Sequence, residues 1–344
     1  MAIEKFIVSR DDSIYEAWPD LVLTDSGKLI CVFSECKHHG DRTDARITWV
    51  TSTDRGRTWS QKFYLTEKGE KTAYWNCARI SKLSDGRLVI SCDFIRGHEN
   101  GRDTQVWLWF SEDDGMTWSE PVPTPLHGIV PDKVVELRSG RWFLAAHTPA
   151  EDTGKLTEYG IYSDDCGKTW SDTVTVAKDE RYNLCEASIV ETSDGTLISF
   201  MRENSAKGID CLKTFSRDGG ETWSEVYKIP IPGCHRPTAG YLSDGRMMIT
   251  YRFLQGGKGG FGTWTHNFMS AFFTEETALG TDRRKQSVRI MPLDYDRSTK
   301  SDLGYSGWVQ FDDGEIYVVQ YIVDDAPNAH IRGYSFTMSD VILG

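Results

Sequence analysis

The sequence contains no long hydrophobic run. No stretch of its 344 residues approaches the roughly 18 continuous apolar residues of a membrane-spanning helix, and residues 1–10 hold no apolar signal-peptide core. Basic residues are in the minority, with 39 Lys and Arg against 51 Asp and Glu, which leaves a net charge of −12. An acidic surface argues against nucleic acid or an anionic membrane as a partner. We expect a cytoplasmic protein, or a secreted one if a signal peptide has been removed.

Signatures of metal, phosphate and cofactor binding are also missing. None of the eight cysteines forms a C-x-x-C pair, so a zinc site is not expected. The sequence has neither a phosphate-binding loop nor a cofactor fingerprint. Cys31 and Cys92 lie in apolar runs, where a buried thiol behaves as a small hydrophobe. We therefore expect no cofactor, no metal and reduced cysteines.

Helical periodicity is almost absent, and a repeat takes its place. The pattern Ser-x-Asp-x-Gly-x-Thr-Trp occurs at residues 52–59, 111–118, 163–170 and 216–223, with 59, 52 and 53 residues between successive glycines. Asp and Ser side chains can accept hydrogen bonds from nearby backbone N–H groups and hold a tight turn, while Gly supplies a positive φ. Each box is predicted to be a structural hairpin turn with Trp as its apolar anchor, and a period near fifty is typical of radially repeated units.

A second kind of turn counts the units. Short Ser/Asp-Gly turns between β-prone apolar runs have as their glycines Gly27, Gly86, Gly140, Gly195, Gly245 and Gly314. In the first four units the box Gly follows the turn Gly by 25 to 29 residues, which leaves room for two further strands. Four strands in each of six units predict an all-β, six-bladed β-propeller occupying residues 1–344 as a single domain. Residues 3–8 and 330–337 are expected to pair and close the ring, and residues 273–285 to form an irregular insertion.

The turn glycines also act as a ruler for the functional site. Nine residues before each Gly stand Trp18, Cys77, Pro131, Glu186, Arg236 and Tyr305, and seven residues after it stand Ser34, Asp93, His147, Arg202, Arg252 and Tyr321. Both offsets fall at the far end of each hairpin, so equivalent positions in six blades should ring one mouth of the propeller axis. Convergent polar groups at such a mouth predict a ligand site.

Neighbouring segments add candidates. The loop at residues 35–44 follows the second strand of the first blade and brings His38, His39, Asp41 and Asp44 to the same mouth. Asp41 or Asp44 could act as a general acid. The aromatic residues Trp18, Tyr74, Trp75 and Trp264 near strand starts could stack on sugar faces.

These features resemble the sialidase (neuraminidase) superfamily over nearly the whole chain. The four boxes are similar to that family's Asp-box, and six blades match its fold. The resemblance implies that Tyr305, in Gly304-Tyr305-Ser306, is a nucleophile and that Glu186 activates it. It implies that Arg202 binds substrate and that Asp41, or else Asp44, is the acid/base residue after the strand Phe33-Ser34-Glu35. Sialidases use tyrosine in place of the second carboxylate of most glycosidases.

One family feature is absent. The family opens with Arg-Ile-Pro, whose arginine binds the substrate carboxylate, whereas this chain has Ala17-Trp18-Pro19. Arg236 or Arg252 could supply another family arginine. The resemblance implies an exo-acting glycoside hydrolase for a terminal, acidic, sialic-acid-like sugar, with a glycan as partner. Three alternatives stay open. One is a polysaccharide lyase or inverting hydrolase using His38, His39 or His147 with Tyr305, another is a glycosidase for a different sugar, and the third is a non-catalytic glycan-binding propeller.

Overall fold

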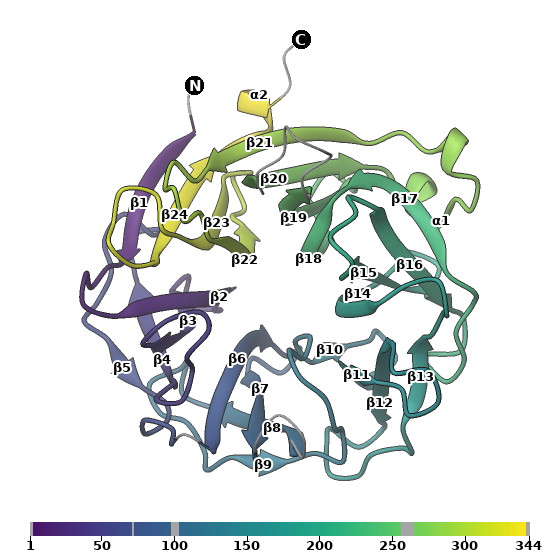
Figure 1. The fold of residues 1–344 in the computed structure, drawn as a ribbon, viewed down its shortest axis with the longest axis horizontal. Coiled ribbons are helices and arrows are strands. Elements are labelled where there is room, and N and C mark those ends of the chain that lie inside the picture. The colour runs from purple at the N-terminus through teal and green to yellow at the C-terminus, as the bar shows by residue number, and fades with distance from the viewer. Residues whose placement is uncertain (1–2, 71, 98–102, 256–264, 342–344) are drawn as a thin grey trace.

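The computed structural model describes residues 3–70, 72–97, 103–255 and 265–341. Six four-stranded antiparallel sheets stand around a central axis, with the first strand of each sheet innermost (Figure 1). The predicted six-bladed, all-β propeller is therefore confirmed. None of the described helices is long and apolar enough to span a membrane.

The chain builds the blades in order from their inner to their outer strands. Blade 1 contains β2 (Tyr15–Leu23), β3 (Leu29–Cys36), β4 (Arg46–Ser52) and β5 (Phe63–Tyr64). Blade 2 contains β6 (Ala73–Lys82), β7 (Leu88–Arg96), β8 (Asp103–Ser111) and β9 (Val122–Pro123). Blade 3 contains β10 (Val135–Glu136), β11 (Trp142–Pro149), β12 (Leu156–Ser163) and β13 (Val174–Ala177). Blade 4 contains β14 (Leu184–Glu191), β15 (Leu197–Glu203), β16 (Asp210–Ser216) and β17 (Tyr227–Pro232).

The last two blades complete the ring. Blade 5 contains β18 (Cys234–Tyr241), β19 (Met247–Gln255), β20 (Thr265–Phe273) and β21 (Arg289–Tyr295). Blade 6 contains β22 (Leu303–Gln310), β23 (Ile316–Ile322) and β24 (His330–Phe336), and its outer strand is β1 (Glu4–Ser9) from the start of the chain. The antiparallel pairing of β1 with β24 confirms the predicted closure, and it leaves no unpaired edge on β24.

The two repeated turns have the predicted geometry. The Ser/Asp-Gly turns join the first and second strands of their blades, and all six glycines have positive φ. The boxes join the third and fourth strands of blades 1 to 4. In the first box, Oγ of Ser52 accepts from the Gly56 N–H at 2.8 Å, and the Asp54 carboxylate accepts from the backbone and hydroxyl of Thr58 at 2.9 and 2.6 Å. The same bonds recur in the other three boxes.

The core is divided among the blade interfaces. The buried hydrophobic residues form six clusters within the described chain, five of which are each shared by two adjacent blades. The sixth joins blades 6 and 1 and also includes Cys77 of blade 2 and Val130. Cys31 and Cys92 lie in these clusters with no exposure, as predicted. All eight cysteines are free thiols. Each blade is thus held by its neighbours, which places the inner strands of all six rigidly around the axis.

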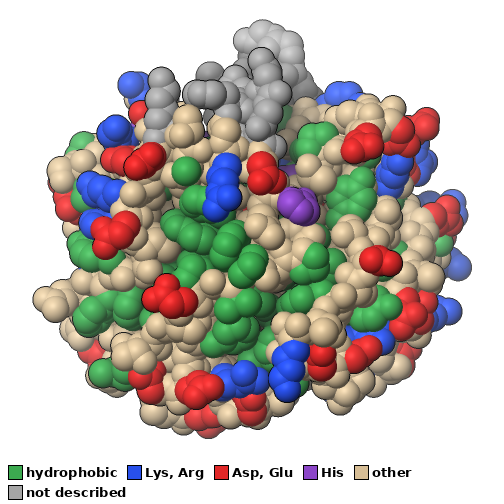
Figure 2. Space-filling view, turned by 90° about the horizontal axis from the view of Figure 1, so that it is seen from below, with side chains coloured by type: hydrophobic (Ala, Val, Ile, Leu, Met, Phe, Trp, Pro, Cys, Tyr) green, Lys and Arg blue, Asp and Glu red, His purple; other side chains and the backbone are tan. Residues whose placement is uncertain are grey.

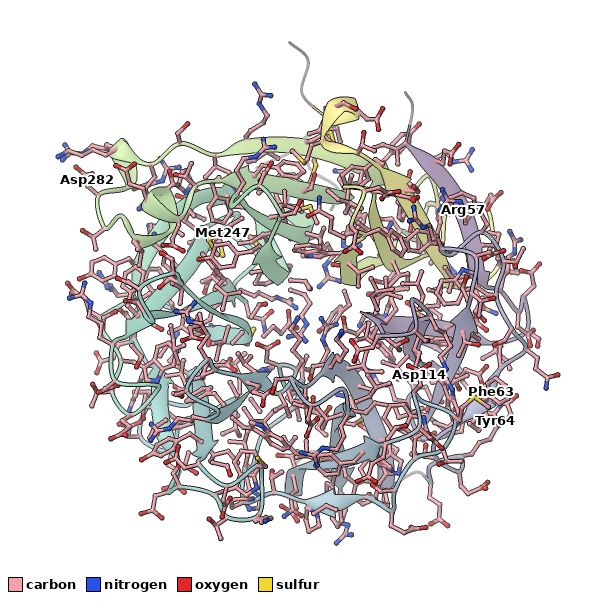
Figure 3. The ribbon with its side chains drawn as sticks, turned by 180° about the vertical axis from the view of Figure 1, so that it is seen from behind. Arg57, Phe63, Tyr64, Asp114, Met247 and Asp282 are labelled. Carbon is pink, nitrogen blue, oxygen red and sulfur yellow. The ribbon has the colours of Figure 1, made fainter. Side chains whose placement is uncertain are left out.

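The outer surface of the ring carries short helical segments and a mixture of hydrophobic and charged side chains. The insertion at residues 273–285 contains the short helix α1 (Glu275–Leu279) and the 3₁₀ turn η2 (Arg283–Lys285), and a second short helix, α2 (Met338–Val341), follows β24. Figure 2 shows hydrophobic side chains interspersed with charged ones on one outer side of the ring. Phe63 and Tyr64 of β5 lie at the outer edge (Figure 3).

Candidate active site

The innermost strands carry the same irregularity at their mouth ends. The pairing of β2, β6, β14, β18 and β22 with the second strand of each blade shifts register beside the residue nine before the turn Gly. Four of these residues have positive φ: Trp18 (57°), Glu186 (57°), Arg236 (50°) and Tyr305 (43°). Non-glycine residues rarely adopt this conformation, and bulges re-aim side chains beside functional sites. The repeated bulge therefore turns equivalent residues of different blades toward the axis.

A cavity of about 920 Å³ occupies this mouth. Its volume lies in the range of about 300–1,000 Å³ that is typical of small-molecule sites. Seven of the predicted site residues line it: His38, His39, His147, Glu186, Arg202, Arg252 and Tyr305. Side chains bearing nitrogen atoms gather at the centre of the ring (Figure 3).

The centre of the site is a phenol bonded to a carboxylate. Oη of Tyr305 donates to Oε1 of Glu186 at 2.5 Å, although the two residues are 119 positions apart. Nη1 of Arg202 donates to the same oxygen at 2.8 Å. Tyr305 and Glu186 are 7% and 4% exposed, so their contact lies almost out of bulk water. The predicted meeting of Glu186 with Tyr305 is thus present in the structure.

The surrounding charges fix where the proton sits. Burial alone would raise the pKa of the Glu186 carboxyl, but the guanidinium groups of Arg202, Arg236 and Arg252 outweigh burial and hold it well below its usual value. Burial, followed by the negative charge of Glu186, raises the pKa of the Tyr305 phenol well above its usual value. The proton therefore belongs to Tyr305, and Glu186 is an ionised acceptor held against it.

Sequence reasoning missed two cations of the cavity, Lys300 and Arg42, and Arg42 is the guanidinium. Its guanidinium lies 4.1 Å from the Trp18 ring centroid, and Nη1 donates to the side-chain oxygen of Asn76. Asn76 in turn donates to the Asp93 carboxylate at 2.8 Å. Arg42 lines the cavity together with Arg202 and Arg252. The sialidase family has its first arginine at the position of Ala17. In this chain the ring of the adjacent Trp18 is covered by Arg42, which comes from the loop between β3 and β4.

A further missed group is Asp302, on the segment between β21 and β22. Its carboxylate accepts from Oη of Tyr15 and, at 2.9 Å, from Oη of Tyr321. It also lies 2.5 Å from Nδ1 of His39 and 3.8 Å from Nη1 of Arg252. Asp302 and Tyr15 line the cavity. No motif marks Asp302, because its segment contains neither a Ser/Asp-Gly turn nor a Ser-x-Asp-x-Gly-x-Thr-Trp box. The available signal in the sequence was its position three residues before Tyr305.

Three predicted ligand-contacting residues support the cavity from below. Arg236 has no exposure and donates to the carbonyls of Pro131 and Ala187 at 3.1 and 3.4 Å, with its guanidinium 5.4 Å from the Tyr305 ring. Asp93 is also fully buried, and burial raises its pKa. Tyr321 is fully buried and bonded to Asp302. None of these three lines the cavity, although Arg236 stands at a bulge of its inner strand as Glu186 and Tyr305 do.

Three of the predicted sugar-stacking aromatic residues, Trp18, Tyr74 and Trp75, also lie outside the cavity lining. Trp18 is 1% exposed and is covered by Arg42. Trp75 packs in the interface of blades 1 and 2, with its ring centroid 4.4 Å from that of Phe94. Trp264 lies outside the described residues.

The two predicted acid/base carboxylates turn back toward their own loop. The Asp41 carboxylate accepts from the backbone and hydroxyl of Thr43 at 3.2 and 2.7 Å, and these bonds lower its pKa. Asp44 accepts from the Lys37 N–H at 3.2 Å. Neither residue lines the cavity, so their acid/base role stays a prediction.

The buried histidines of the site are neutral near pH 7. Burial lowers the pKa of His147 and of His266 to about 4. Nδ1 of His147 accepts from the Glu186 N–H at 3.3 Å, which helps to hold the bulge that presents Glu186. Within the described residues, no group of three His, Cys, Asp or Glu side chains is arranged to hold a metal ion.

The fold and the cavity together define a class of protein: a six-bladed propeller whose axial mouth holds a phenol–carboxylate pair among guanidinium groups. The model of the BNR repeat-like domain family matches residues 4–122 and 67–318. Because these matches extend over most of the sequence, the chain belongs to the BNR repeat-like domain family, as a sialidase-like propeller.

Curated relatives agree with this placement. A sialidase from Paraclostridium sordellii is 25% identical over 208 residues, which cover 50% of this chain and 52% of that protein. A sialidase from Clostridium perfringens is 24% identical over 245 residues, which cover 65% of this chain and 53% of that protein. The chain thus spans about half the length of these two relatives.

Solved structures share the fold. A protein of unknown function from Dyadobacter fermentans has a TM-score of 0.78 at 21% identity, over 97% of this chain and 98% of that one. The Hadza microbial sialidase Hz136 has a TM-score of 0.69 at 20% identity, over 95% of this chain and 66% of that one. An α-L-arabinofuranosidase from Fusarium graminearum has a TM-score of 0.63 at 11% identity, over 98% of both chains. Likeness at these identities concerns the fold alone.

Proposed function

We propose that this protein is an exo-acting glycoside hydrolase that removes a terminal acidic sugar from a glycan through a covalent intermediate on Tyr305. The observation that carries the proposal is the 2.5 Å contact between Oη of Tyr305 and Oε1 of Glu186 inside a cavity lined by three arginines. The sialidases among the relatives and the resemblance of the sequence support the same reaction class.

The geometry suits a phenolic nucleophile. Tyrosine is a weak nucleophile while it keeps its proton, and an adjacent base activates it. Glu186 is ionised, touches the phenol and is held by Arg202, so the proton can move along an existing hydrogen bond when Tyr305 attacks. A neutral nucleophile also avoids the repulsion that a carboxylate would exert on an anionic substrate.

The positive charge of the cavity supports an acidic substrate. Guanidinium groups bind carboxylates through paired, charge-assisted hydrogen bonds. Arg202 is paired with Glu186 and Arg252 with Asp302, while the hydrogen-bond partners of Arg42 are two uncharged groups, the Asn76 side chain and the His39 carbonyl. Arg42 is therefore the guanidinium best placed to bind the carboxylate of a substrate. It would take the role of the family arginine that is absent at the position of Ala17.

The test is a screen of nitrophenyl glycosides of sialic acid, uronic acids and neutral sugars on three proteins. These are the wild type, Tyr305→Phe and the matched control Tyr227→Phe, whose phenol bonds to Glu225 at 2.9 Å on the exposed surface. We expect the wild type and Tyr227→Phe to release an acidic sugar with retained configuration. Tyr305→Phe should lose at least 10³-fold of kcat/KM with its thermal unfolding midpoint unchanged.

Each alternative has its own signature in that screen. Wild-type turnover by Tyr305→Phe contradicts the nucleophile. An ultraviolet-absorbing unsaturated product identifies a lyase, and glycan binding without any released sugar identifies a lectin. Preference for a neutral sugar contradicts the role given to Arg42.

A further inference from the structure

The loop at residues 37–44 contains a tight turn at His38–Asp41, which directs some side chains of the loop to the cavity and others away from it. The His38 and Asp41 backbones pair, with the Asp41 N–H donating to the His38 carbonyl at 2.9 Å. His39 and Gly40 form the tip of this turn and line the cavity, whereas the Asp41 carboxylate is directed to Thr43. Nε of Arg42 donates to the His39 carbonyl at 3.1 Å and fixes the tip from below. The turn thus places two histidines, His38 and His39, at the cavity and turns the nearby carboxylate away.

The imidazole of His39 is oriented by a carboxylate from another blade. Its Nδ1 lies 2.5 Å from the Asp302 carboxylate, 263 positions further along the chain. Trp18 packs against the ring edge-on, with centroids 5.4 Å apart. The His39 side chain is 38% exposed, and among the described residues none hydrogen-bonds to its Nε2. One nitrogen is therefore held by Asp302, and the other has no hydrogen-bond partner among the described residues.

We infer that His39 is the general acid and base of the proposed hydrolysis and that Asp302 is its positioning residue. This inference rests on the proposed function and takes the role that sequence reasoning gave to Asp41 or Asp44. His39 and Tyr305 line the same cavity, and they come from blade 1 and blade 6, which adjoin at the closure of the ring.

The two chemical steps balance through these groups. In the first, Oη of Tyr305 bonds to the anomeric carbon as the glycosidic C–O bond breaks. The phenol proton passes to Glu186, and the protonated Nε2 of His39 gives its proton to the departing oxygen. In the second, neutral His39 takes a proton from water, whose oxygen bonds to the anomeric carbon as the bond to Tyr305 breaks. Glu186 then returns its proton to Tyr305, so the net change is one water added across the glycosidic bond.

The surroundings of His39 suit a group that gains and loses a proton. Asp302 faces its Nδ1 from the segment before β22, and the Tyr15 hydroxyl faces it from β2. Arg42 and His266 face His39 from blade 1 and blade 5, and Arg252 lies behind Asp302. Burial would raise the pKa of Asp302, but the bond to His39 and the charges of His39 and Arg252 hold it well below its usual value. The ionised Asp302 carboxylate thus holds Nδ1 of His39 through a charged contact between two blades.

The experiment uses one acidic sugar on two leaving groups, nitrophenol and an alkyl alcohol. An acid catalyst matters most when the departing oxygen is a strong base. We expect His39→Asn to lower kcat/KM about 10²- to 10³-fold on the alkyl glycoside and less than 10-fold on the nitrophenyl glycoside. Added azide, which needs no base, should restore turnover of the nitrophenyl glycoside and give a glycosyl azide. The control is His127→Asn, an exposed histidine on another part of the ring.

Asp302 is tested by the pH profile. Asp302→Asn should move the alkaline limb of kcat/KM to lower pH, because the imidazolium loses its carboxylate, and Asp302→Glu should restore part of that shift. His39→Asn should abolish the limb altogether. Thermal unfolding of every variant identifies those that fail to fold. If His39→Asn fails to fold, His39→Gln is used in its place.

The outcomes separate this inference from the proposed function. If the wild type hydrolyses an acidic glycoside and His39→Asn behaves as His127→Asn, the inference is overturned while the proposed function stands. It is equally overturned if Asp41→Asn or Asp44→Asn shows the leaving-group-dependent loss. If the wild type releases no sugar from any glycoside, the proposed function fails first and this inference with it.

Discussion

At the scale of single residues, position in a turn decides which side chains reach the cavity. His39, Asp41 and Arg42 are neighbours in one loop, yet His39 and Arg42 line the cavity and Asp41 does not. The sequence identifies the loop but not the conformation of its turn, so it could not distinguish the three. Glu186 and Tyr305 were predictable, because each stands at a fixed offset from a turn glycine and each matches a family motif.

Arg42 is expected to anchor the substrate carboxylate. Arg42→Gln should raise KM for the acidic sugar about 10- to 100-fold, since a charge-assisted hydrogen bond contributes about 1.5–3 kcal/mol. Its effect on kcat should be smaller, and a neutral analogue of the same sugar should show no such dependence. Steady-state kinetics check this against Arg284→Gln, an arginine at the exposed periphery. An unchanged KM for the acidic sugar would remove Arg42 from the binding site.

At the scale of elements, turns fix the blades and bulges fix the site. The two repeated turns gave the blade count and the strand order, because Gly, Asp and Ser have strong local preferences. The bulges at Trp18, Glu186, Arg236 and Tyr305 could not be foreseen, since all four are non-glycine residues with φ between 43° and 57°, a conformation that such residues rarely adopt. Arg236 and Tyr321 were therefore expected in the cavity and lie beneath it.

The box turns also hold adjacent blades together. Gly56 (φ +81°) lies under the Tyr317 ring of blade 6, so that an added Cβ would fall 2.2 Å from a ring carbon, and the Tyr317 hydroxyl donates to the Gly56 carbonyl at 2.7 Å. Gly140 (φ +88°) would place its Cβ in open space. Both Ala variants should lose roughly 1–2 kcal/mol of unfolding free energy from backbone strain, and Gly56→Ala a further 1–3 kcal/mol from overpacking.

Urea unfolding of Gly56→Ala and Gly140→Ala in parallel measures that difference. Equal losses would show that the box does not join blade 1 to blade 6.

At the scale of the whole molecule, the ring depends on the seam between β1 and β24. The first and last strands were identified from their apolar patterns, and their pairing makes the mouth a closed ring in which blade 6 meets blade 1. Two members of the proposed machinery lie at this closure, because Tyr305 comes from blade 6 and His39 from blade 1. The stability of the seam and the geometry of the site should therefore change together.

His330, on β24, makes the seam sensitive to acid. Burial, followed by the charges of Arg332 and Arg10, lowers the pKa of His330 from 6.5 to about 4. Between pH 6.5 and about 4, His330 is protonated in the unfolded chain but neutral in the folded chain. The free energy of unfolding therefore decreases as the pH falls through this range.

The measurement is urea unfolding of the wild type and His330→Gln at several pH values in this window. The wild type should lose stability relative to the variant by about 1–3 kcal/mol across it. If the difference in unfolding free energy between the two proteins does not change with pH, His330 is not buried in its uncharged form.

The central claim is that Tyr305 forms a bond to the sugar while Glu186 takes its proton. The most direct measurement is intact-protein and peptide mass spectrometry after incubation with a fluorinated acidic glycosyl fluoride, whose fluorine substituent slows the second step. The account predicts one glycosyl adduct on the peptide that contains Tyr305, and no adduct in Tyr305→Phe. Turnover of substrate by the wild type with no adduct, or with the adduct on another residue, would contradict it.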